Sequence, residues 1–284
     1  MIIALVVLSA FLHAAWNALL KREPDKDHTL IAAVAFGSLL ATGVAGVRVF
    51  SSGVPAFATP ASFFWALVAG AFEQLYFYGL ARALDRGPLG PVYTISRGGA
   101  VIIVYPLSVL LFKEPLAALS ITGSAVVLAG LVCSDLRIGA GVLRAMPRAA
   151  TLWALICAVA IAAYHLAYKA GLEDGGAPSS VFAVSLALST AISLSRTGSS
   201  GRRIVFGFIR ANLPKVMLMG ALCGGSFLIL IEALSHGGAG FVLTLRNTSV
   251  LFAMLLAWAI GERPRLAPAM GAALVATGAV LMAL

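Results

Sequence analysis

The chain has 284 residues, of which 61% are hydrophobic and only 11% are charged, and its formal net charge is +9 at pH 7. A soluble domain contains about 45–50% apolar and about 25% charged residues, so this composition excludes a soluble globular protein. It also argues against a nucleic-acid partner, because the cations lie between long apolar tracts, a pattern typical of the charges that orient membrane helices.

Apolar tracts recur along the whole chain and predict an all-α integral membrane protein. A helix that crosses the bilayer needs about 20 mostly apolar residues. Tracts of this kind predict ten transmembrane helices, at 2–20, 29–48, 62–84, 90–112, 116–134, 150–171, 179–195, 214–235, 239–260 and 266–284. The segment after the seventh range mixes Ile204, Phe206 and Phe208 with arginines and is predicted to lie on the membrane surface.

Lys and Arg are unevenly divided between alternate loops. The loops after the second, fourth, sixth and eighth helices contain only Arg48, Lys113 and Lys169. The opposite loops contain Lys21, Arg22, Lys26, Arg82, Arg86, Arg137, Arg144, Arg148, Arg196, Arg202, Arg203, Arg210, Lys215, Arg263 and Arg265. By the positive-inside rule the second set is cytoplasmic. Both termini are therefore expected on the periplasmic or extracellular side of the inner (plasma) membrane.

The two halves of the chain resemble each other. "GAFEQLYFYGLARAL" at 70–84 aligns with "GALCGGSFLILIEAL" at 220–234, and "HAAWNALL" aligns with "HLAYKAGL". The alignment predicts a five-helix repeat at 1–134, a cytoplasmic linker at 135–149 and a second repeat at 150–284. Because each repeat has an odd number of helices, the second must be inverted in the membrane. Inverted repeats are typical of transporters with a substrate site near the midplane.

The segments "FKEPLAALSITGSAVVLAG" and "IGERPRLAPAMGAALVATG", together with "HAAWN", resemble the drug/metabolite transporter superfamily, and in particular its ten-helix EamA-type group. The resemblance covers essentially the whole chain. It implies a secondary transporter, with export of amino acids or other metabolites among the family's activities. "FKEP" departs from the usual Gly-Glu at the corresponding point of the family pattern.

Ionisable side chains inside the predicted helices are candidates for the substrate cavity, because they are costly in hydrocarbon. Glu73 is a carboxylate near the middle of a predicted helix, and Tyr76, Phe77 and Tyr78 follow it within about one turn. It could exchange protons or contact a substrate ammonium group. The alternative is a structural hydrogen bond to a neighbouring helix.

Arg97 and Arg246 occupy corresponding positions in the fourth and ninth predicted helices. Both could face the cavity and bind an anionic group such as a carboxylate through paired hydrogen bonds. The alternative is a structural role, in which each reaches the interface or caps a neighbouring helix.

Two trios of polar and aromatic residues also correspond in the alignment: His13, Trp16 and Asn17, and His165, Tyr168 and Lys169. Spacings of three and four place each trio on one helical face, where its rings could contact a substrate. The alternative is an aromatic belt near the membrane interface. The full set of predicted cavity residues is His13, Trp16, Asn17, Glu73, Tyr76, Phe77, Tyr78, Tyr93, Arg97, His165, Tyr168, Lys169, Arg246 and Asn247.

Other positions are predicted to be structural. Gly123 and Gly130, like Gly271 and Gly278, are seven residues apart and are expected at close helix contacts. Glu114 and Glu262 precede the last helix of each half and are expected to cap it. The three cysteines are far apart in the sequence and indicate no metal site, and no cofactor is expected.

These observations predict a secondary transporter that moves small amphipathic metabolites by alternating access. Amino acids, including aromatic ones, are the leading cargo, and export is the expected direction. The alternative is proton-coupled efflux of cationic drugs through Glu73. An intramembrane enzyme is a weaker hypothesis, because H-E-x-x-H and G-x-S-x-G motifs do not occur, and a channel is a weaker hypothesis as well. No P-loop motif occurs, so ATP hydrolysis by this chain is not expected. The expected partners are the substrate and the lipid bilayer, and both a monomer and a homodimer are compatible with the sequence.

Overall fold

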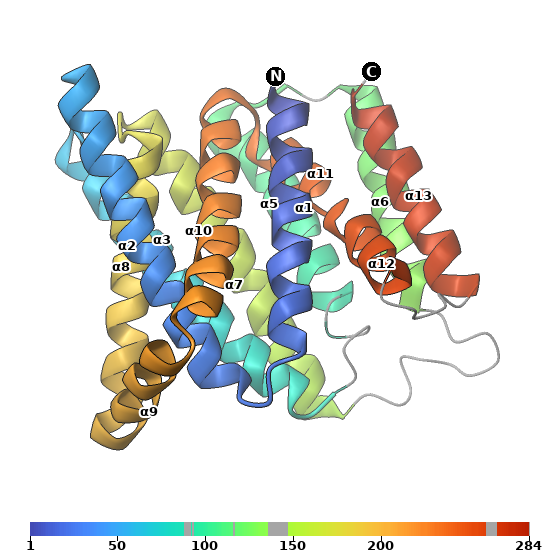
Figure 1. The fold of residues 1–284 in the computed structure, drawn as a ribbon. Coiled ribbons are helices and arrows are strands. Elements are labelled where there is room, and N and C mark those ends of the chain that lie inside the picture. Colours follow the sequence, from blue (N-terminus) through green and yellow to red (C-terminus); the bar gives the residue numbers. More distant parts are fainter. Residues whose placement is uncertain (88–91, 93, 116, 136–146, 260–265, 284) are drawn as a thin grey trace.

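Helices form every regular element in the parts of the chain that the computed structural model describes, which are residues 1–87, 92, 94–115, 117–135, 147–259 and 266–283. The elements in chain order are α1 (Ile2–Lys21), α2 (Lys26–Ser52), α3 (Pro60–Leu84), the π-helix η1 (Thr94–Gly98), α5 (Gly99–Phe112), α6 (Ala118–Asp135), α7 (Arg148–Glu173), α8 (Pro178–Arg196), α9 (Gly198–Ala211), α10 (Leu213–His236), α11 (Ala239–Arg246), α12 (Ser249–Ala259) and α13 (Leu266–Ala283). Both termini lie at the same end of the bundle (Figure 1).

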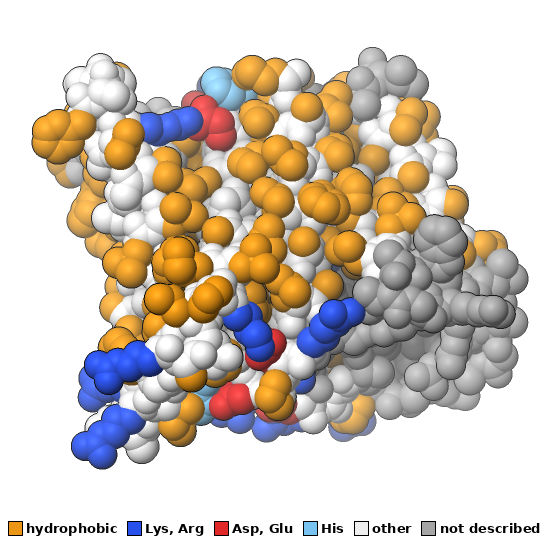
Figure 2. Space-filling view, viewed as in Figure 1, with side chains coloured by type: hydrophobic (Ala, Val, Ile, Leu, Met, Phe, Trp, Pro, Cys, Tyr) orange, Lys and Arg blue, Asp and Glu red, His pale blue; other side chains and the backbone are white. Residues whose placement is uncertain are grey.

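Six helical segments of the described residues are long and apolar enough to cross a membrane: α1, α2, Ile95–Phe112, α7, α8 and α10. The apolar parts of α6, α11–α12 and α13 are shorter. On the described part of the face shown in Figure 2, hydrophobic side chains cover the middle and most charged groups lie toward the two ends. On α2, for example, Phe50 is 94% exposed and Leu39 is 72% exposed. An apolar belt of this kind faces lipid, so the chain is a multi-pass membrane protein.

The segment predicted as one helix at 239–260 is discontinuous, which corrects the sequence expectation. It forms α11 and α12, with Asn247 and Thr248 between them. The N–H of Asn247 donates to Thr244 O at 3.0 Å and that of Thr248 donates to Leu245 O at 3.1 Å. These i→i−3 bonds tighten the last turn of α11 and end the regular α-helical ladder.

The predicted helix at 90–112 also contains an irregular element. It contains η1, whose wider π-helical turns include Arg97, and η1 continues directly as α5. The extra residue of a π-turn changes the direction in which neighbouring side chains point. Arg97 and Arg246 are therefore each carried by an irregular part of a helix.

The two glycine pairs confirm the predicted close helix contact, which joins α6 to α13. A Cβ atom on Gly130 would lie 2.7 Å from the carbonyl oxygen of Gly271, and one on Gly123 would lie 2.7 Å from that of Gly278. No side chain fits at these crossings. The same kind of approach brings α2 and α10 together, because a Cβ on Gly37 would lie 3.2 Å from Gly220 O.

The expectation that Glu114 caps the helix following it is wrong. Its Oε1 accepts a hydrogen bond from the N–H of Ala239 at 2.7 Å, so the carboxylate caps the start of α11. An N–H at a helix N-terminus needs such an acceptor, and here it comes from the other half of the chain. Glu262 lies outside the described residues.

The basic segment predicted to lie on the membrane surface is the amphipathic helix α9. Val205 is buried against α2, whereas Ile204 and Phe206 on the same helix are exposed. The helix lies at the end of the bundle opposite both termini (Figure 1). Its contact with α2 leaves these two apolar side chains free to enter the edge of the bilayer.

Candidate functional site

A small cavity lies where α1, α3, η1, α7, α10 and α11 meet. Its volume is about 20 Å³, which is room for about one water molecule. The lining residues are His13, Tyr76, Arg97, Ile161, Tyr164, His165, Phe227, Leu243, Arg246 and Asn247. The cavity therefore contains residues from both halves of the sequence, and a molecule larger than water can enter only if the helices around it separate.

His13 lies between the two arginines. Its Nε2 is 2.7 Å from a terminal nitrogen of Arg97, and its Nδ1 is 3.2 Å from a terminal nitrogen of Arg246. The indole N–H of Trp16 also points at Nδ1, at 3.2 Å. Arg97 donates in addition to the hydroxyl of Ser249 at 3.3 Å. The imidazole thus joins an arginine of the first half to an arginine of the second.

Arg246 is almost fully buried, with 3% of its surface exposed. Its guanidinium carbon lies 4.2 Å from the ring centroid of Phe227, a cation–π contact, and its Nε has no hydrogen-bond partner. Among the described residues it forms no ion pair with a carboxylate. The C-terminal end of α11, where it stands, carries partial negative charge that offsets part of the cost of burial.

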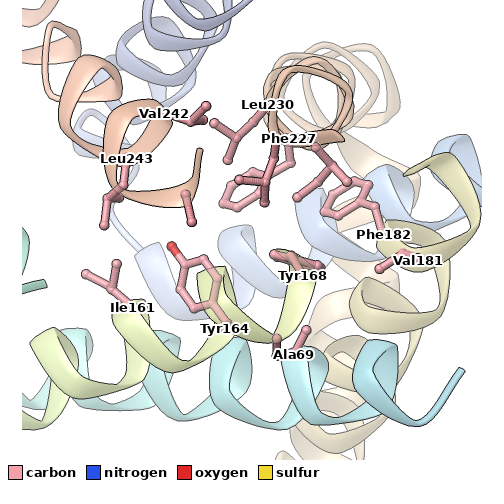
Figure 3. Close-up of a cluster of buried hydrophobic side chains, with 14 of the residues drawn as sticks. Ala69, Ile161, Tyr164, Tyr168, Val181, Phe182, Phe227, Leu230, Val242 and Leu243 are labelled. Carbon is pink, nitrogen blue, oxygen red and sulfur yellow. The ribbon is translucent and has the colours of Figure 1, made fainter. Parts of the chain in front are cut away.

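Aromatic rings form much of the remaining wall. Tyr164 stacks on His165 with ring centroids 4.5 Å apart, and Tyr76 lies 6.0 Å from Tyr164. Figure 3 shows Ile161 and Tyr164 on one side of this region and Leu243 and Phe227 on the other. The Nδ1 of His165 contacts Ile161 O at 2.9 Å, while its buried Nε2 has no partner. An apolar ring with one polar end would therefore match this lining.

Glu73 lies beside the cavity and does not line it. One of its oxygens accepts hydrogen bonds from the hydroxyl groups of Tyr168 and Ser185, each at 3.1 Å. These two hydroxyls are also 2.7 Å from each other. The second oxygen of Glu73 is buried without a hydrogen-bond partner. The carboxylate thus links α3 to α7 and α8.

The structure brings six of the predicted residues to the cavity: His13, Tyr76, Arg97, His165, Arg246 and Asn247. Trp16, Glu73 and Tyr168 contact this group or lie next to it. Asn17 bonds the carbonyl of His13 at 2.8 Å, and the ring of Phe77 lies against that of Tyr76. Tyr93 lies outside the described residues.

Lys169 and Tyr78 lie away from the cavity. The ammonium of Lys169 bonds Gly237 O at 3.2 Å and Glu173 at 2.9 Å, so it ties α7 to the end of α10. Tyr78 contacts Arg82 and Arg196, whose guanidinium carbons lie 5.0 and 4.1 Å from its ring centroid. Both residues share a helix with cavity residues but point elsewhere.

Ile161, Tyr164, Phe227 and Leu243 line the cavity and are not among the predicted residues. Two of them could have been identified as candidates from the sequence. Tyr164 stands one turn before Tyr168 on the same helix, and the alignment of 70–84 with 220–234 pairs Phe227 with Phe77. Ile161 and Leu243 are ordinary core residues in the sequence, and nothing distinguishes them there.

Apolar helices with an outward-facing hydrophobic surface, a discontinuous helix and buried cations at a central cavity are features typical of membrane transporters. The model of the EamA-like transporter family matches residues 148–284, a range that begins at the first residue of α7. Residues 148–284 are therefore similar to an EamA-like transporter domain, the domain of a family of membrane transporters.

The fold extends beyond the matched half. A solved structure described as "Crystal structure of protein" superimposes with a TM-score of 0.72 at 20% sequence identity, over 99% of this chain and 94% of that chain. At this identity the likeness concerns the fold alone. No curated protein matches the chain.

Proposed function

We propose that the protein is a secondary transporter of the inner membrane that moves small amphipathic metabolites by alternating access. The observation that carries the proposal is the junction at His13, where Arg97 and Arg246 approach from the two halves of the chain beside a small cavity. A site shared by two halves changes shape when the halves rock against each other. The proposed cargo is an amino acid, aromatic ones included, and the proposed direction is export.

The helix contacts support an arrangement of ten transmembrane helices in two inverted five-helix repeats, 1–134 and 150–284. In the sequence alignment α1 corresponds to α7, and α3 corresponds to α10. In the first half α3 packs against α7 and α8, and in the second half α10 packs against α1 and α2. Exchanging the two halves therefore reproduces the same set of contacts. Corresponding helices α2 and α8, like α6 and α13, pack against each other, as elements at a two-fold axis do.

Both ends of the bundle are held closed by contacts between the halves. At the end that contains the termini, Phe57 forms an antiparallel bridge with Gly176, and Arg48 pairs with Glu232 at 2.6 Å. At the end that contains α9, Lys215 pairs with Glu23 at 2.9 Å. Alternating access requires that the contacts at one end break while those at the other end stay in place. We assign the α9 end to the cytoplasm and both termini to the outer side.

Counterflow in proteoliposomes tests this function. Vesicles loaded with unlabelled L-phenylalanine should accumulate the labelled amino acid transiently, and the initial rate should saturate with external concentration. Vesicles without protein are the control. A flux that rises linearly and shows no counterflow would indicate a channel. Comparison of right-side-out and inside-out membrane vesicles reports the direction, because an exporter fills the inside-out vesicles.

Proton-coupled efflux of cationic drugs is the second candidate, and one observation favours it. Glu73 is a fully buried carboxylate with one unpartnered oxygen, held by hydroxyl groups on two other helices. Such a group could exchange a proton for cargo. Glu73→Gln keeps its size and removes the exchangeable proton. Transport of phenylalanine is measured for this variant and for the unmodified protein, each with and without a pH gradient. If the rates of the two proteins agree under both conditions, proton coupling through Glu73 is excluded.

A further inference from the structure

We propose that the cavity selects its cargo by a carboxylate group and does not require an amino group, so that aromatic and other apolar carboxylic acids are substrates alongside amino acids. This inference rests on the proposed transport function and names the chemical feature that the site recognises. It follows from the balance of hydrogen-bond donors and acceptors around His13, from the charge at Arg246 and from the position of Glu73.

Donors exceed acceptors around His13. A neutral imidazole accepts a hydrogen bond at one ring nitrogen and donates at the other. Here Arg97 faces Nε2, while Arg246 and Trp16 both face Nδ1, and all three groups only donate. In either tautomer at least one of these donors points at a nitrogen that cannot accept. A protonated imidazole would accept at neither nitrogen. An acceptor-only group placed among these donors removes the conflict.

Arg246 adds a buried positive charge to this group. It forms no ion pair within the part of the chain that the structure describes, and its buried Nε has no hydrogen-bond partner. A buried charge is costly unless it is paired. A ligand carboxylate would supply both the missing charge and acceptors for the planar guanidinium, to which it can bind through two parallel hydrogen bonds.

The described lining of the cavity offers no matching site for an ammonium group. It contains no carboxylate. The nearby Glu73 lies beside the cavity, where Tyr168 and Ser185 hold one of its oxygens and the other is buried without a hydrogen-bond partner. An ammonium group would instead lie close to two guanidinium groups. The rest of the lining, which includes Tyr164 and Phe227, suits an apolar or aromatic body. The amino group of an amino acid therefore contributes little to recognition.

A series of four ligands of nearly equal size separates the contribution of the carboxylate group to binding from that of the amino group. The unmodified protein in lipid nanodiscs is titrated by calorimetry with 3-phenylpropanoate, L-phenylalanine, 2-phenylethylamine and 3-phenylpropan-1-ol. We expect the first two to bind with affinities within a factor of about ten of each other, and the amine and the alcohol to bind about 10- to 100-fold more weakly. Binding of the amine as tightly as the acid, or no binding of the acid, overturns the proposal.

Variants of Arg246 locate the effect. Arg246→Gln should weaken binding of 3-phenylpropanoate about 10- to 100-fold, and Arg246→Lys should retain part of the affinity because it keeps the charge. Arg203→Gln on the exposed surface of α9 is the matched control and should bind like the unmodified protein. Thermal unfolding of each variant shows whether it is folded. Equal affinities of the unmodified protein and a folded Arg246→Gln variant contradict the assignment.

Transport distinguishes failure of this inference from failure of the proposed function. In counterflow, labelled 3-phenylpropanoate should exchange against internal phenylalanine. Saturable exchange of phenylethylamine without exchange of the acid would refute the carboxylate rule and leave the transporter intact. If none of the four ligands gives counterflow above empty vesicles, both proposals are wrong.

Discussion

The carboxylate of Glu114, two residues beyond the end of α5, accepts a hydrogen bond from the backbone N–H of Ala239, the first residue of α11. The two residues are separated by 125 positions in the sequence. This bond fixes the start of the short helix that ends in Arg246. It connects one half of the chain directly to the element that carries a cavity residue of the other half.

Removal of this cap should destabilise the protein. Glu114→Ala leaves an N–H at the start of α11 without its acceptor, and loss of a helix cap costs about 0.5–2 kcal/mol. Glu114→Gln keeps an acceptor and loses only the charge, so its effect should be smaller. Thermal unfolding in detergent measures both variants. Equal unfolding temperatures for Glu114→Ala and the unmodified protein would show that the bond is unimportant.

The crossing of α6 and α13 should tolerate no added methyl group. A Cβ at Gly130 would lie 2.7 Å from a backbone oxygen, so Gly130→Ala must separate the helices, at a cost of about 1–3 kcal/mol. Gly46→Ala on α2 is a matched control because no atom lies within 4 Å of its Cβ position. That variant should be neutral or stabilising by up to about 1 kcal/mol, since Ala is the better helix former. If Gly130→Ala and Gly46→Ala both lower the unfolding temperature to the same extent, the tight crossing at Gly130 is not the cause.

A disulfide across the end that contains the termini should stop transport reversibly. The N–H of Ala177 donates to Ala56 O at 3.0 Å, next to the bridge between Phe57 and Gly176. Opposed residues of antiparallel strands are about 5.5 Å apart at Cα, a separation that a disulfide can span. The oxidised double variant Ala56→Cys, Ala177→Cys should lose counterflow and regain it on reduction. Each single variant serves as control, and full activity of the oxidised double variant would show that this end need not open.

Lys169 should affect stability and leave substrate affinity unchanged. Its ammonium donates to Leu234 O in the last turn of α10 and to Gly237 O directly after that helix, and it does not line the cavity. Lys169→Met should lower stability by about 1–3 kcal/mol, because it leaves these acceptors without their charged donor. The concentration of phenylalanine that gives half-maximal counterflow should stay the same. A large increase in that concentration would show that Lys169 contributes to substrate binding after all.

Composition and charge were sufficient to predict the class of protein, because the requirements of the bilayer act on each helix separately. A tract that faces lipid must be apolar along its length wherever its neighbours lie. Small residues at helix crossings follow a similar local rule. The glycines of α6 and α13 could therefore be recognised from their spacing, and the structure confirms their contact.

The partner of each polar side chain was decided by the tertiary structure. His13, Arg97 and Arg246 stand in three separate elements, and only the rotation and tilt of those elements bring their side chains together. The same degrees of freedom turn Lys169 away from the cavity and direct Glu114 to α11 instead of the next helix. The amino-acid sequence by itself thus determined what the membrane requires of each helix, and packing between helices decided which polar groups meet.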